Sequence, residues 1–313
     1  MLFFNQVKLE KFIIEKKHKR ILWINISAPS LGDSLMDLSS RVLLQDKSID
    51  LFTSKKNAHL FYDDKVFNGV YSDISQRIDK EYDLIILDSY STRSMKIKRK
   101  IAKNTYFVGM FGFFNGPEVN RVLFSFFQMN NLLPINEKKD MELIQSEVKN
   151  SIAFNQKDID IIDSLSLPRK FISIVIGGEW DYRKYRKWAE VISLLIAYKP
   201  DIKIVLLGSE NALKDSKKIL AKFPTGNIYD FINRLSFKQS AIIISKSDRM
   251  LCCDGGLMHA GNASGVISVS LFAKLTPKMQ LTDAIKSFPL FDKEDVNNIH
   301  PKEIYDKFLE SYN

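Results

Sequence analysis

Short apolar runs alternate with stretches of helical spacing along both halves of the chain. Such runs are typical of buried strands, and we expect strands at residues 21–26, 49–53, 66–71, 82–88, 171–176, 202–207, 250–253 and 266–272. Helical spacing lies between them, with apolar residues at 31, 35, 38 and 42 and again at 188, 191, 192 and 195. This alternation predicts parallel sheets with helices on both faces, so the fold class is α/β.

The polar and charged stretch at residues 136–157 interrupts this alternation, and Pro168 follows it. A domain boundary is expected where the composition turns polar. We therefore predict two Rossmann-like domains, residues 1–160 and 161–313, each long enough to bury its own core. A final helix is expected from Pro301, where apolar residues again have helical spacing.

Residues 250–272 contain a strand, a turn, a helix, a second turn and a second strand. The first apolar run ends at Asp254-Gly255-Gly256, residues 257–264 fit two helical turns, and Gly265 stands where a C-cap glycine belongs. Such a unit places the helix start at the carboxyl edge of a parallel sheet, where doubly wound proteins bind ligands. Free N–H groups there favour phosphate, the glycines leave room for a diphosphate, and His259 could point at the same anion.

A purely structural interpretation uses the same residues. Asp254 would cap the helix, Gly255 and Gly256 would form the turn, and His259 would be a hydrogen-bonded histidine of the core. For this stretch taken alone, both interpretations stay open.

The first half of the chain holds a second unit of this kind. The apolar run at residues 21–26 leads into a loop of Ser, Pro and Gly at residues 27–32, and a helix starts near Asp33. A carboxylate at such an edge could take the proton of an attacking hydroxyl group. Asp33 could equally be the N-cap of the helix, and the two roles are compatible.

Composition and charge narrow the function classes. The 313 residues are 45% hydrophobic and 12% aromatic, which excludes a disordered chain. The formal net charge of +9 favours acidic partners such as phosphates, nucleic acid or an anionic membrane face. The two cysteines, Cys252 and Cys253, are adjacent, which is neither a disulfide framework nor a metal-ligand spacing and fits a reducing cytoplasm. No apolar run can span a bilayer, so we expect a soluble or peripheral protein.

Two segments resemble the signatures of one enzyme family. Asp254-Gly255-Gly256-Leu257-Met258-His259 resembles the Asp-[Ser/Thr]-Gly-Leu-x-His signature of the ADP-heptose:lipopolysaccharide heptosyltransferases, glycosyltransferase family 9. Ser30-Leu31-Gly32-Asp33 before a helix is similar to the amino-terminal signature of the same family. The resemblance implies a GT-B fold, in which two Rossmann-like doubly wound domains face each other across a cleft. It assigns acceptor binding to residues 1–160 and nucleotide-sugar donor binding to residues 161–313, with the last helix packing back on the amino-terminal domain.

The resemblance also implies roles for individual residues. It makes Asp33 the general base that deprotonates the acceptor hydroxyl. The donor-binding set that it implies is Arg186, Glu210, Leu235, Asp254, Gly255, Gly256, Leu257 and His259. The acceptor-binding set is Ser30, Arg93 and Ser94.

Three of the donor positions rest on short patterns. Arg186 stands for the Lys of Lys-x-Trp, Glu210 for the acid of Gly-x-Glu, and Leu235 for the [Met/Leu]-Ser that packs the base. A surface arginine, a solvated glutamate and a core leucine are the structural alternatives. Each alternative is the commoner situation for one residue alone, whereas the joint order and spacing favour the family roles.

Several basic residues mark the predicted helix that follows the strand at 82–88. They are Lys96, Lys98, Arg99, Lys100 and Lys103. They could meet acceptor phosphates or anionic lipid, or they could form an ordinary solvated face.

The chain also departs from the family pattern. Gly255 replaces the Thr or Ser after the signature Asp, and residues 272–277 replace the sequence Phe-Gly-x-[Ser/Thr]-x-Pro. The segment at residues 278–298 is shorter than the loop that relatives carry at this place. These changes leave the identity of the donor open.

The combined features predict an inverting glycosyltransferase that works in the cytoplasm, at the inner face of the cytoplasmic membrane. By resemblance it moves heptose from ADP-heptose onto a lipopolysaccharide or lipooligosaccharide core. No Asp-x-Asp metal motif adjoins the predicted donor residues, so we expect no metal and no other cofactor, with a helix start and cationic side chains replacing the divalent ion. The alternatives are another donor such as a UDP-hexose, or a non-catalytic sugar-nucleotide binding protein. No recognised motif supports a nucleic-acid partner.

Overall fold

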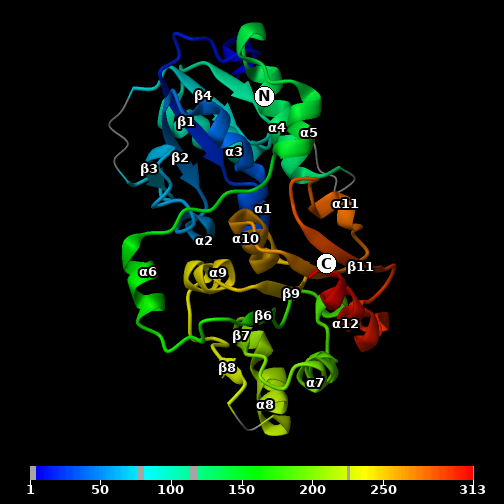
Figure 1. Cartoon of the computed structure of the whole chain (residues 1–313). Helices are drawn as coiled ribbons and strands as arrows, with labels where there is room; N and C mark the ends of the chain where they lie inside the picture. Colours follow the sequence, from blue (N-terminus) through cyan, green and yellow to red (C-terminus); the bar gives the residue numbers. More distant parts are fainter. Residues whose placement is uncertain (1–4, 77–80, 113–118, 224–225, 313) are drawn as a thin grey trace. The chain divides into compact units, whose positions relative to one another are not determined.

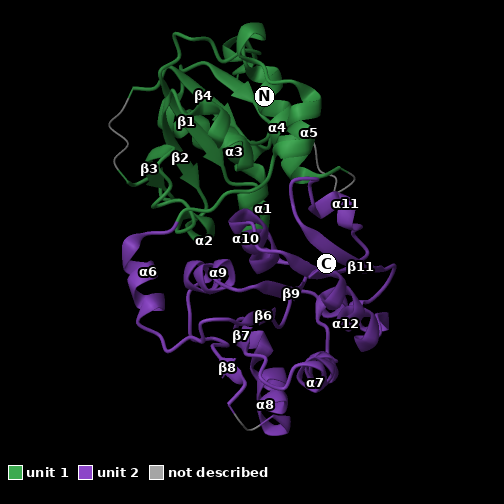
Figure 2. Ribbon diagram, in the orientation of Figure 1, with its two compact units in different colours: residues 1–153 green, residues 154–313 purple. Residues whose placement is uncertain are grey.

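The structure is a computed structural model that describes residues 5–76, 81–112, 119–223 and 226–312. The chain forms two compact units, Met1–Ala153 and Phe154–Asn313 (Figure 2). The division lies a few residues before the expected boundary at 160, so helix α6 (Gln156–Asp163) belongs to unit 2.

The described residues of unit 1 form a parallel sheet of five strands in the order β3-β2-β1-β4-β5 (Figure 1). Strands β2 and β4 flank β1 on opposite sides, so the strand order reverses at β1, and a doubly wound sheet binds its ligand at the carboxyl ends of such strands. The elements of unit 1 are η2 (Val7–Leu9), β1 (Arg20–Asn25), α1 (Leu31–Asp37), η3 (Ser39–Leu44), β2 (Ser48–Thr53), α2 (Lys55–Ala58), β3 (Phe67–Tyr71), β4 (Leu84–Leu87), α3 (Thr92–Ala102), β5 (Phe107–Gly109), α4 (Arg121–Leu132), η4 (Ile135–Glu137) and α5 (Met141–Glu147).

Burial on both faces of the unit 1 sheet explains the continuous apolar runs in its strands. Residues 21–25 of β1 are all buried. Leu22 packs in one cluster with Met95 of α3, while Met36 of α1 and Val122 of α4 belong to a second cluster. Helices α1, α3 and α4, which carry the candidate residues of this unit, are therefore fixed by apolar contacts.

The described residues of unit 2 form a parallel sheet of six strands in the order β11-β10-β9-β6-β7-β8. Its edge strand β11 contains Pro289, which an edge tolerates because no ladder partner needs the missing N–H. The elements of unit 2 after α6 are β6 (Ile172–Val175), η5 (Asp181–Arg183), α7 (Trp188–Tyr198), β7 (Ile204–Leu207), η6 (Glu210–Ala212), α8 (Leu213–Lys222), β8 (Ile228–Asp230), α9 (Phe237–Ser245), β9 (Arg249–Cys253), α10 (Gly256–Ser264), β10 (Ser268–Ala273), α11 (Pro277–Gln280), β11 (Ser287–Asp292), η7 (Val296–Asn298) and α12 (Pro301–Glu310).

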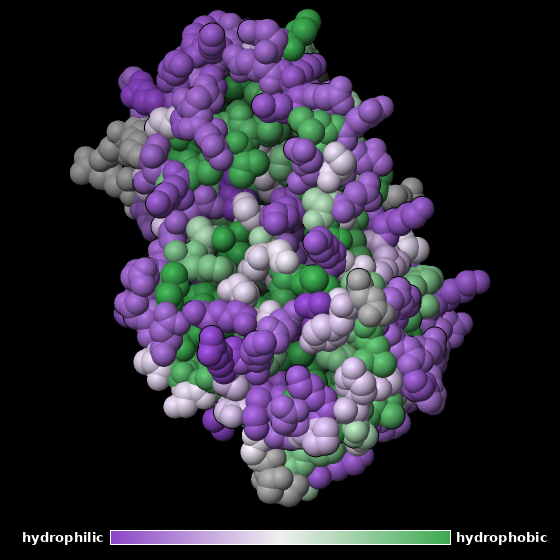
Figure 3. Space-filling view, in the orientation of Figure 1, coloured by the Kyte–Doolittle hydropathy of each residue, from purple (hydrophilic) through white to green (hydrophobic). Residues whose placement is uncertain are grey.

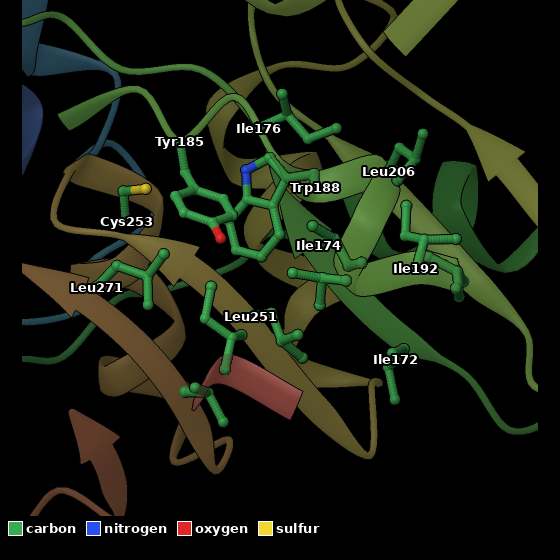
Figure 4. Close-up of a cluster of buried hydrophobic side chains, with 14 of the residues drawn as sticks. Ile172, Ile174, Ile176, Tyr185, Trp188, Ile192, Leu206, Leu251, Cys253 and Leu271 are labelled. Atoms are coloured by element: carbon green, nitrogen blue, oxygen red, sulfur yellow. The ribbon is translucent and has the colours of Figure 1, made fainter. Parts of the chain in front are cut away.

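An aromatic pair anchors the loop between β6 and α7 to the sheet of unit 2. Tyr185 and Trp188 meet edge to face with ring centroids 5.0 Å apart, and Figure 4 shows them beside apolar side chains of β6, β7, β9 and β10. The Tyr185 hydroxyl donates to the carbonyl oxygen of Ile299 at 3.1 Å. The residues just before α7 therefore have a fixed position relative to the sheet edge.

Helix α12 has its buried face in the core of unit 2. Ile304 and Phe308 belong to that core, and the helix packs against α7, β10 and β11. Pro301 opens the helix, and His300 forms a capping box with Glu303. The predicted last helix is thus present, and the apolar residues expected in it pack within unit 2.

The molecular face drawn in Figure 3 mixes hydrophilic and hydrophobic side chains over both units. Within the described part of the chain, no helix combines the length and the apolar composition that crossing a membrane requires.

Candidate functional site

Asp33 lies in the first turn of α1, close to the carboxyl end of β1. Ser30 is the N-cap of this helix: its Oγ accepts from the N–H of Asp33 at 3.2 Å and donates to Asp33 Oδ2 at 2.6 Å. The structural alternative for Asp33 is therefore wrong, because Ser30 occupies the N-cap position. The Asp33 side chain is 22% exposed, so a bound molecule can reach it.

Arg121, the first residue of α4, joins Asp33 to a second carboxylate of α1. Its Nη1 lies 2.9 Å from Asp33 Oδ1, while Nε and Nη2 donate to the two oxygens of Asp37 at 2.5 and 3.0 Å. Burial raises the pKa of Asp37, and the guanidinium limits that rise. Burial alone would lower the pKa of Arg121, but Asp37 and Asp33 more than reverse this effect and raise it. The guanidinium stays charged and orients Asp33 through Oδ1.

Asp88, directly after β4, fixes the loop that leads from β1 to α1. Its Oδ2 accepts from the backbone N–H groups of Ile26 and Ser27, each at 2.7 Å. Its Oδ1 accepts from the Ser89 N–H at 2.6 Å and from the Ser94 hydroxyl at 2.7 Å. A buried carboxylate with four donors is fully satisfied, so the role of Asp88 is to position the loop.

The structure separates the Arg93-Ser94 pair that the resemblance assigned to the acceptor. Ser94 is buried and its hydroxyl donates to Asp88, so it orders the loop instead of facing a bound molecule. Arg93 is exposed, and its Nη2 donates to the carbonyl oxygen of Ile26 just after β1. Of the pair, Arg93 is the residue that an acceptor could contact.

The basic residues of α3 do not form a single face. Lys98 is fully buried, and its Nζ donates to Gln6 Oε1 at 2.6 Å and to the carbonyl oxygen of Lys103 at 3.0 Å. Burial lowers the pKa of Lys98 to about 8. Lys96 and Lys100 are exposed. The expectation that Lys98 shares a basic surface with them is wrong, because its side chain points into the fold.

The predicted strand–helix–strand unit is present as β9, α10 and β10. Gly265 ends α10 as a left-handed C-cap with φ 79°. Gly255 is the N-cap with extended backbone, φ 171°, and no side chain of the described residues caps the helix. A Cβ on Gly255 would meet nothing closer than the carbonyl oxygen of Cys253, at 4.0 Å. The start of α10 is therefore open in two respects: its N-cap residue has no side chain to bond the first-turn N–H groups, and there is room beside Gly255, an arrangement that favours a phosphate group.

Asp254 does not cap α10, so that structural alternative is wrong. Its carboxylate is 2% exposed, with Oδ2 3.0 Å from Arg183 Nη1 and Oδ1 3.8 Å from His259 Nε2. Arg183 ends η5, in the loop between β6 and α7. His259 is 4% exposed and lies against Asp254. The buried carboxylate is thus compensated by a guanidinium from another segment.

The other three donor positions lie in the connections that follow β6, β7 and β8. Arg186 is exposed just before α7, with Nη2 3.8 Å from Asp181 Oδ1. Glu210 is exposed at the start of η6. Leu235 is half-buried and packs on a core cluster of unit 2. Because these connections follow parallel strands, they share the sheet edge where α10 begins.

Neither of the two arginines that pair with the site carboxylates was predicted from the sequence. Arg121 is 88 residues from Asp33 in the chain, and neither Arg121 nor Arg183 stands in a recognised motif. One signal was available for the first pair. Asp33 and Asp37 are four residues apart on one helix face, where two carboxylates repel each other unless a cation lies between them.

The described residues of the types that commonly bind metals do not form a metal site. Both cysteines are buried and free, and burial raises the pKa of Cys252 to about 12. Among the residues that the structure describes, no group of three or more His, Cys, Asp and Glu side chains could hold a metal ion. The expectation of a metal-independent reaction stays a prediction.

Comparison with known proteins identifies the family. The model of glycosyltransferase family 9 (heptosyltransferase) matches residues 114–288, more than half of the chain. The chain belongs to this family. It is a glycosyltransferase. No curated protein matches the sequence.

Solved structures of family 9 enzymes share the fold. The glycosyl transferase family 9 protein of Veillonella parvula DSM 2008 has a TM-score of 0.78 at 12% identity, over 96% of this chain and 99% of that one. E. coli ADP-heptose LPS heptosyltransferase II has 0.74 at 18% identity, over 93% and 98%. E. coli heptosyltransferase WaaC with ADP has 0.72 at 13% identity, over 93% and 99%. The predicted fold class, GT-B with two Rossmann-like units, is confirmed.

Proposed function

We propose that this family 9 glycosyltransferase moves a sugar from a nucleoside diphosphate sugar to an acceptor hydroxyl with inversion at the anomeric carbon. The observation that carries the proposal is the open start of α10, which lies in the family's signature segment at a sheet edge. Helix starts with free N–H groups stabilise phosphate, and the leaving group of this reaction is a diphosphate. ADP-heptose is the donor that the resemblance favours. Of the similar solved structures, one is an ADP-heptose LPS heptosyltransferase and another is a heptosyltransferase with ADP.

Donor binding in unit 2 would combine the open helix start with side chains of neighbouring connections. Gly255 and Gly256 allow the diphosphate to approach the backbone, and Leu257 follows them in the first turn. Arg186 would add a cation, Glu210 would reach the nucleoside, and Leu235 would pack against the base. These three roles are the ones that the resemblance implies. Asp254 and His259, which the resemblance also assigns to donor binding, are buried and would support the turn that holds the diphosphate. No step of the proposal needs a metal ion.

Asp33 would activate the acceptor in unit 1. Each of its oxygens accepts one hydrogen bond, from Arg121 and from Ser30, so each retains a lone pair for the acceptor proton. The acceptor oxygen bonds to the anomeric carbon while the bond from that carbon to the diphosphate oxygen breaks. Asp33 receives the hydroxyl proton, and the nucleoside diphosphate leaves with the electron pair. Arg93, exposed beside the same loop, would contact the acceptor.

We further propose an anionic glycolipid, the lipopolysaccharide or lipooligosaccharide core, as the acceptor, met at the cytoplasmic face of the inner membrane. The net charge of +9 and the exposed Lys96 and Lys100 of α3 support an anionic partner. Unit 1 also has an exposed apolar group: Phe12, Ile13 and Ile135. The Ile14 N–H donates to the Leu132 carbonyl, which places residues 12–14 beside the end of α4, close to Ile135.

Membrane association can be tested separately from transfer. The intact protein should float with vesicles that contain anionic lipid and not with zwitterionic vesicles, because the proposed attraction depends on charge. Phe12→Ser/Ile135→Ser should weaken flotation and leave donor affinity unchanged. Equal flotation with both kinds of vesicle, or with none, contradicts the membrane part of the proposal and leaves the transfer reaction standing.

The transfer reaction is tested with purified protein, ADP-heptose or UDP-hexoses, and a truncated lipooligosaccharide acceptor. We expect nucleoside diphosphate release that depends on acceptor, a product heavier by one sugar, and an inverted anomeric configuration by NMR. Donor binding without turnover for any acceptor would instead indicate the non-catalytic binding protein. A UDP-hexose donor is the second candidate, because Gly255 replaces the Thr or Ser of the family signature and leaves the identity of the donor open. Thermal stabilisation by ADP-heptose against UDP-sugars decides between the donors.

A further inference from the structure

Lys274, the residue after β10, has a strained backbone at the edge where α10 begins. Its φ is 65°, in the left-handed region that costs a lysine about 1–2 kcal/mol relative to ordinary conformations. The pairing of Leu271 with Cys253 puts the ends of β10 and β9 side by side, and β9 leads into α10. Lys274 therefore lies beside the open helix start, in the stretch where the chain departs from the family sequence.

A tyrosine ring gathers two cations at this edge. Lys274 Nζ lies 4.1 Å from the centroid of the Tyr182 ring, and the guanidinium of Arg183 lies 5.4 Å from it. Tyr182 itself stacks on the exposed Trp180, with centroids 6.4 Å apart. The Lys274 ammonium and the Arg183 guanidinium thus lie near the same ring, and both would attract an anion that binds beside them.

The charges of the cluster do not balance. Arg183 is compensated by Asp254 at 3.0 Å. For Lys274, no carboxylate of the described residues lies within ion-pair distance. One positive charge thus remains uncompensated next to N–H groups that also attract an anion.

We propose that Lys274 binds the phosphate groups of the sugar-nucleotide donor, with Tyr182 and Arg183 as the residues that position it. The inference rests on the proposed function and adds a cation at a position that the family pattern leaves unspecified. Backbone strain that is retained at a ligand edge is consistent with a binding role, because a glycine or asparagine would adopt the same φ at lower cost.

The strain supplies a test with two readouts of opposite sign. Lys274→Gly removes the ammonium and relieves the left-handed backbone. We expect the Kd for ADP, or for UDP if that nucleotide binds more tightly, to rise about 10-fold in calorimetric titration without metal. We also expect the melting temperature of the ligand-free protein to rise by about 2–4 °C. A residue with a purely structural role would not lower affinity while raising stability.

Three further variants sharpen the result. Lys274→Asn tolerates the backbone and lacks the charge, so it should bind as weakly as Lys274→Gly, whereas Lys274→Arg should recover most of the affinity. Tyr182→Leu should weaken binding less than Lys274→Gly, because the ammonium remains but is no longer held. Lys217→Ala removes an exposed lysine of α8 and should leave the Kd unchanged.

The possible outcomes distinguish a failure of the proposed function from a failure of the role proposed for Lys274. If neither ADP nor UDP binds the wild-type protein, the proposed function fails and this inference fails with it. If the nucleotide binds wild type and Lys274→Gly equally, the inference is overturned and the proposed function stands. A loss in Arg186→Ala alone assigns the phosphates to Arg186, and a raised KM for the acceptor with unchanged nucleotide affinity assigns Lys274 to an acceptor phosphate. Either result overturns the inference.

Discussion

Replacing Arg121 by lysine should lower turnover while leaving the fold and the donor affinity largely intact. Arg121 forms two hydrogen bonds with the buried Asp37 and one with Asp33. A lysine has the same net charge, but its ammonium group is compact and cannot bond to both carboxylates at once as the planar guanidinium does. The lysine should remain with Asp37, because a buried carboxylate without a partner costs about 3–5 kcal/mol. Asp33 then loses the contact that orients Oδ1.

The size of the effect follows from that single contact. A hydrogen bond between charged groups contributes about 1.5–3 kcal/mol, and a loss of that size in the transition state lowers kcat by about 10- to 100-fold. The free energy of unfolding should fall by about 1 kcal/mol, since Asp37 keeps a cation. The donor Kd should stay within about twofold of wild type, because the donor residues belong to unit 2. Arg121→Met, in contrast, should destabilise the protein by several kcal/mol.

The assay is a double-mutant cycle with Asp33→Asn, read as kcat, donor Kd and urea denaturation. Because Arg121 acts through Asp33, Arg121→Lys should cause little further loss of turnover in the Asp33→Asn background. Additive losses would show that Arg121 touches the acceptor or the donor directly. Full wild-type turnover in Arg121→Lys would refute the reasoning, since the orientation of Asp33 would then not depend on the guanidinium.

Three other outcomes can be measured with the same protein. Asp33→Asn should keep donor affinity and lower kcat by about 10²-fold or more, as loss of a general base usually does; near wild-type turnover would leave Asp33 with only a structural role. Activity should survive EDTA, and complete loss that Mg²⁺ or Mn²⁺ restores would contradict the proposed helix and cation stabilisation of the diphosphate. Burial lowers the folded pKa of Lys98 to about 8, below its ordinary value, so folding releases a proton and stability rises with pH through this window. Between pH 7 and 9.5 the free energy of unfolding of wild type should gain about 2 kcal/mol relative to Lys98→Met, and equal slopes in urea denaturation would place Lys98 in solvent.

The elements at both sheet edges could be predicted because they depend on local pattern. The strand ending at Cys253, the helix to Ser264 and the left-handed Gly265 follow from an apolar run, two glycines and a C-cap position, and the structure has all three. The loop after β1 followed from its Ser, Pro and Gly content in the same way. The predicted start of α1 near Asp33 was two residues too late, because the helix begins at Leu31 and Ser30 rather than Asp33 is the N-cap.

Burial within a basic or polar segment could not be predicted. The helix around Lys98 has the composition of a solvated face. The burial of Lys98 depends on hydrogen bonds to the Gln6 side chain and to the carbonyl oxygen of Lys103 at the helix end. Ser94 likewise differs from an exposed serine only through Asp88, which directly follows the preceding strand β4. At both positions, hydrogen bonds to other parts of the chain determine that the side chain is buried. The hydropathy pattern of a single segment cannot predict such bonds.

Asp254 shows how a tertiary contact decides between a structural and a functional use of the same residues. A capping aspartate would accept from the first-turn N–H groups of α10 and would leave fewer of them for a phosphate. Its negative charge at that place would also oppose an anion. Arg183 instead pairs with Asp254 at 3.0 Å, inside the unit, and the helix begins at Gly255 without a side-chain cap. The local sequence is compatible with either arrangement, because the arginine that selects one of them lies in the loop before α7. The Arg183–Asp254 pair thereby keeps the helix start open, and the phosphate-binding role proposed for it depends on that pair as much as on the two glycines.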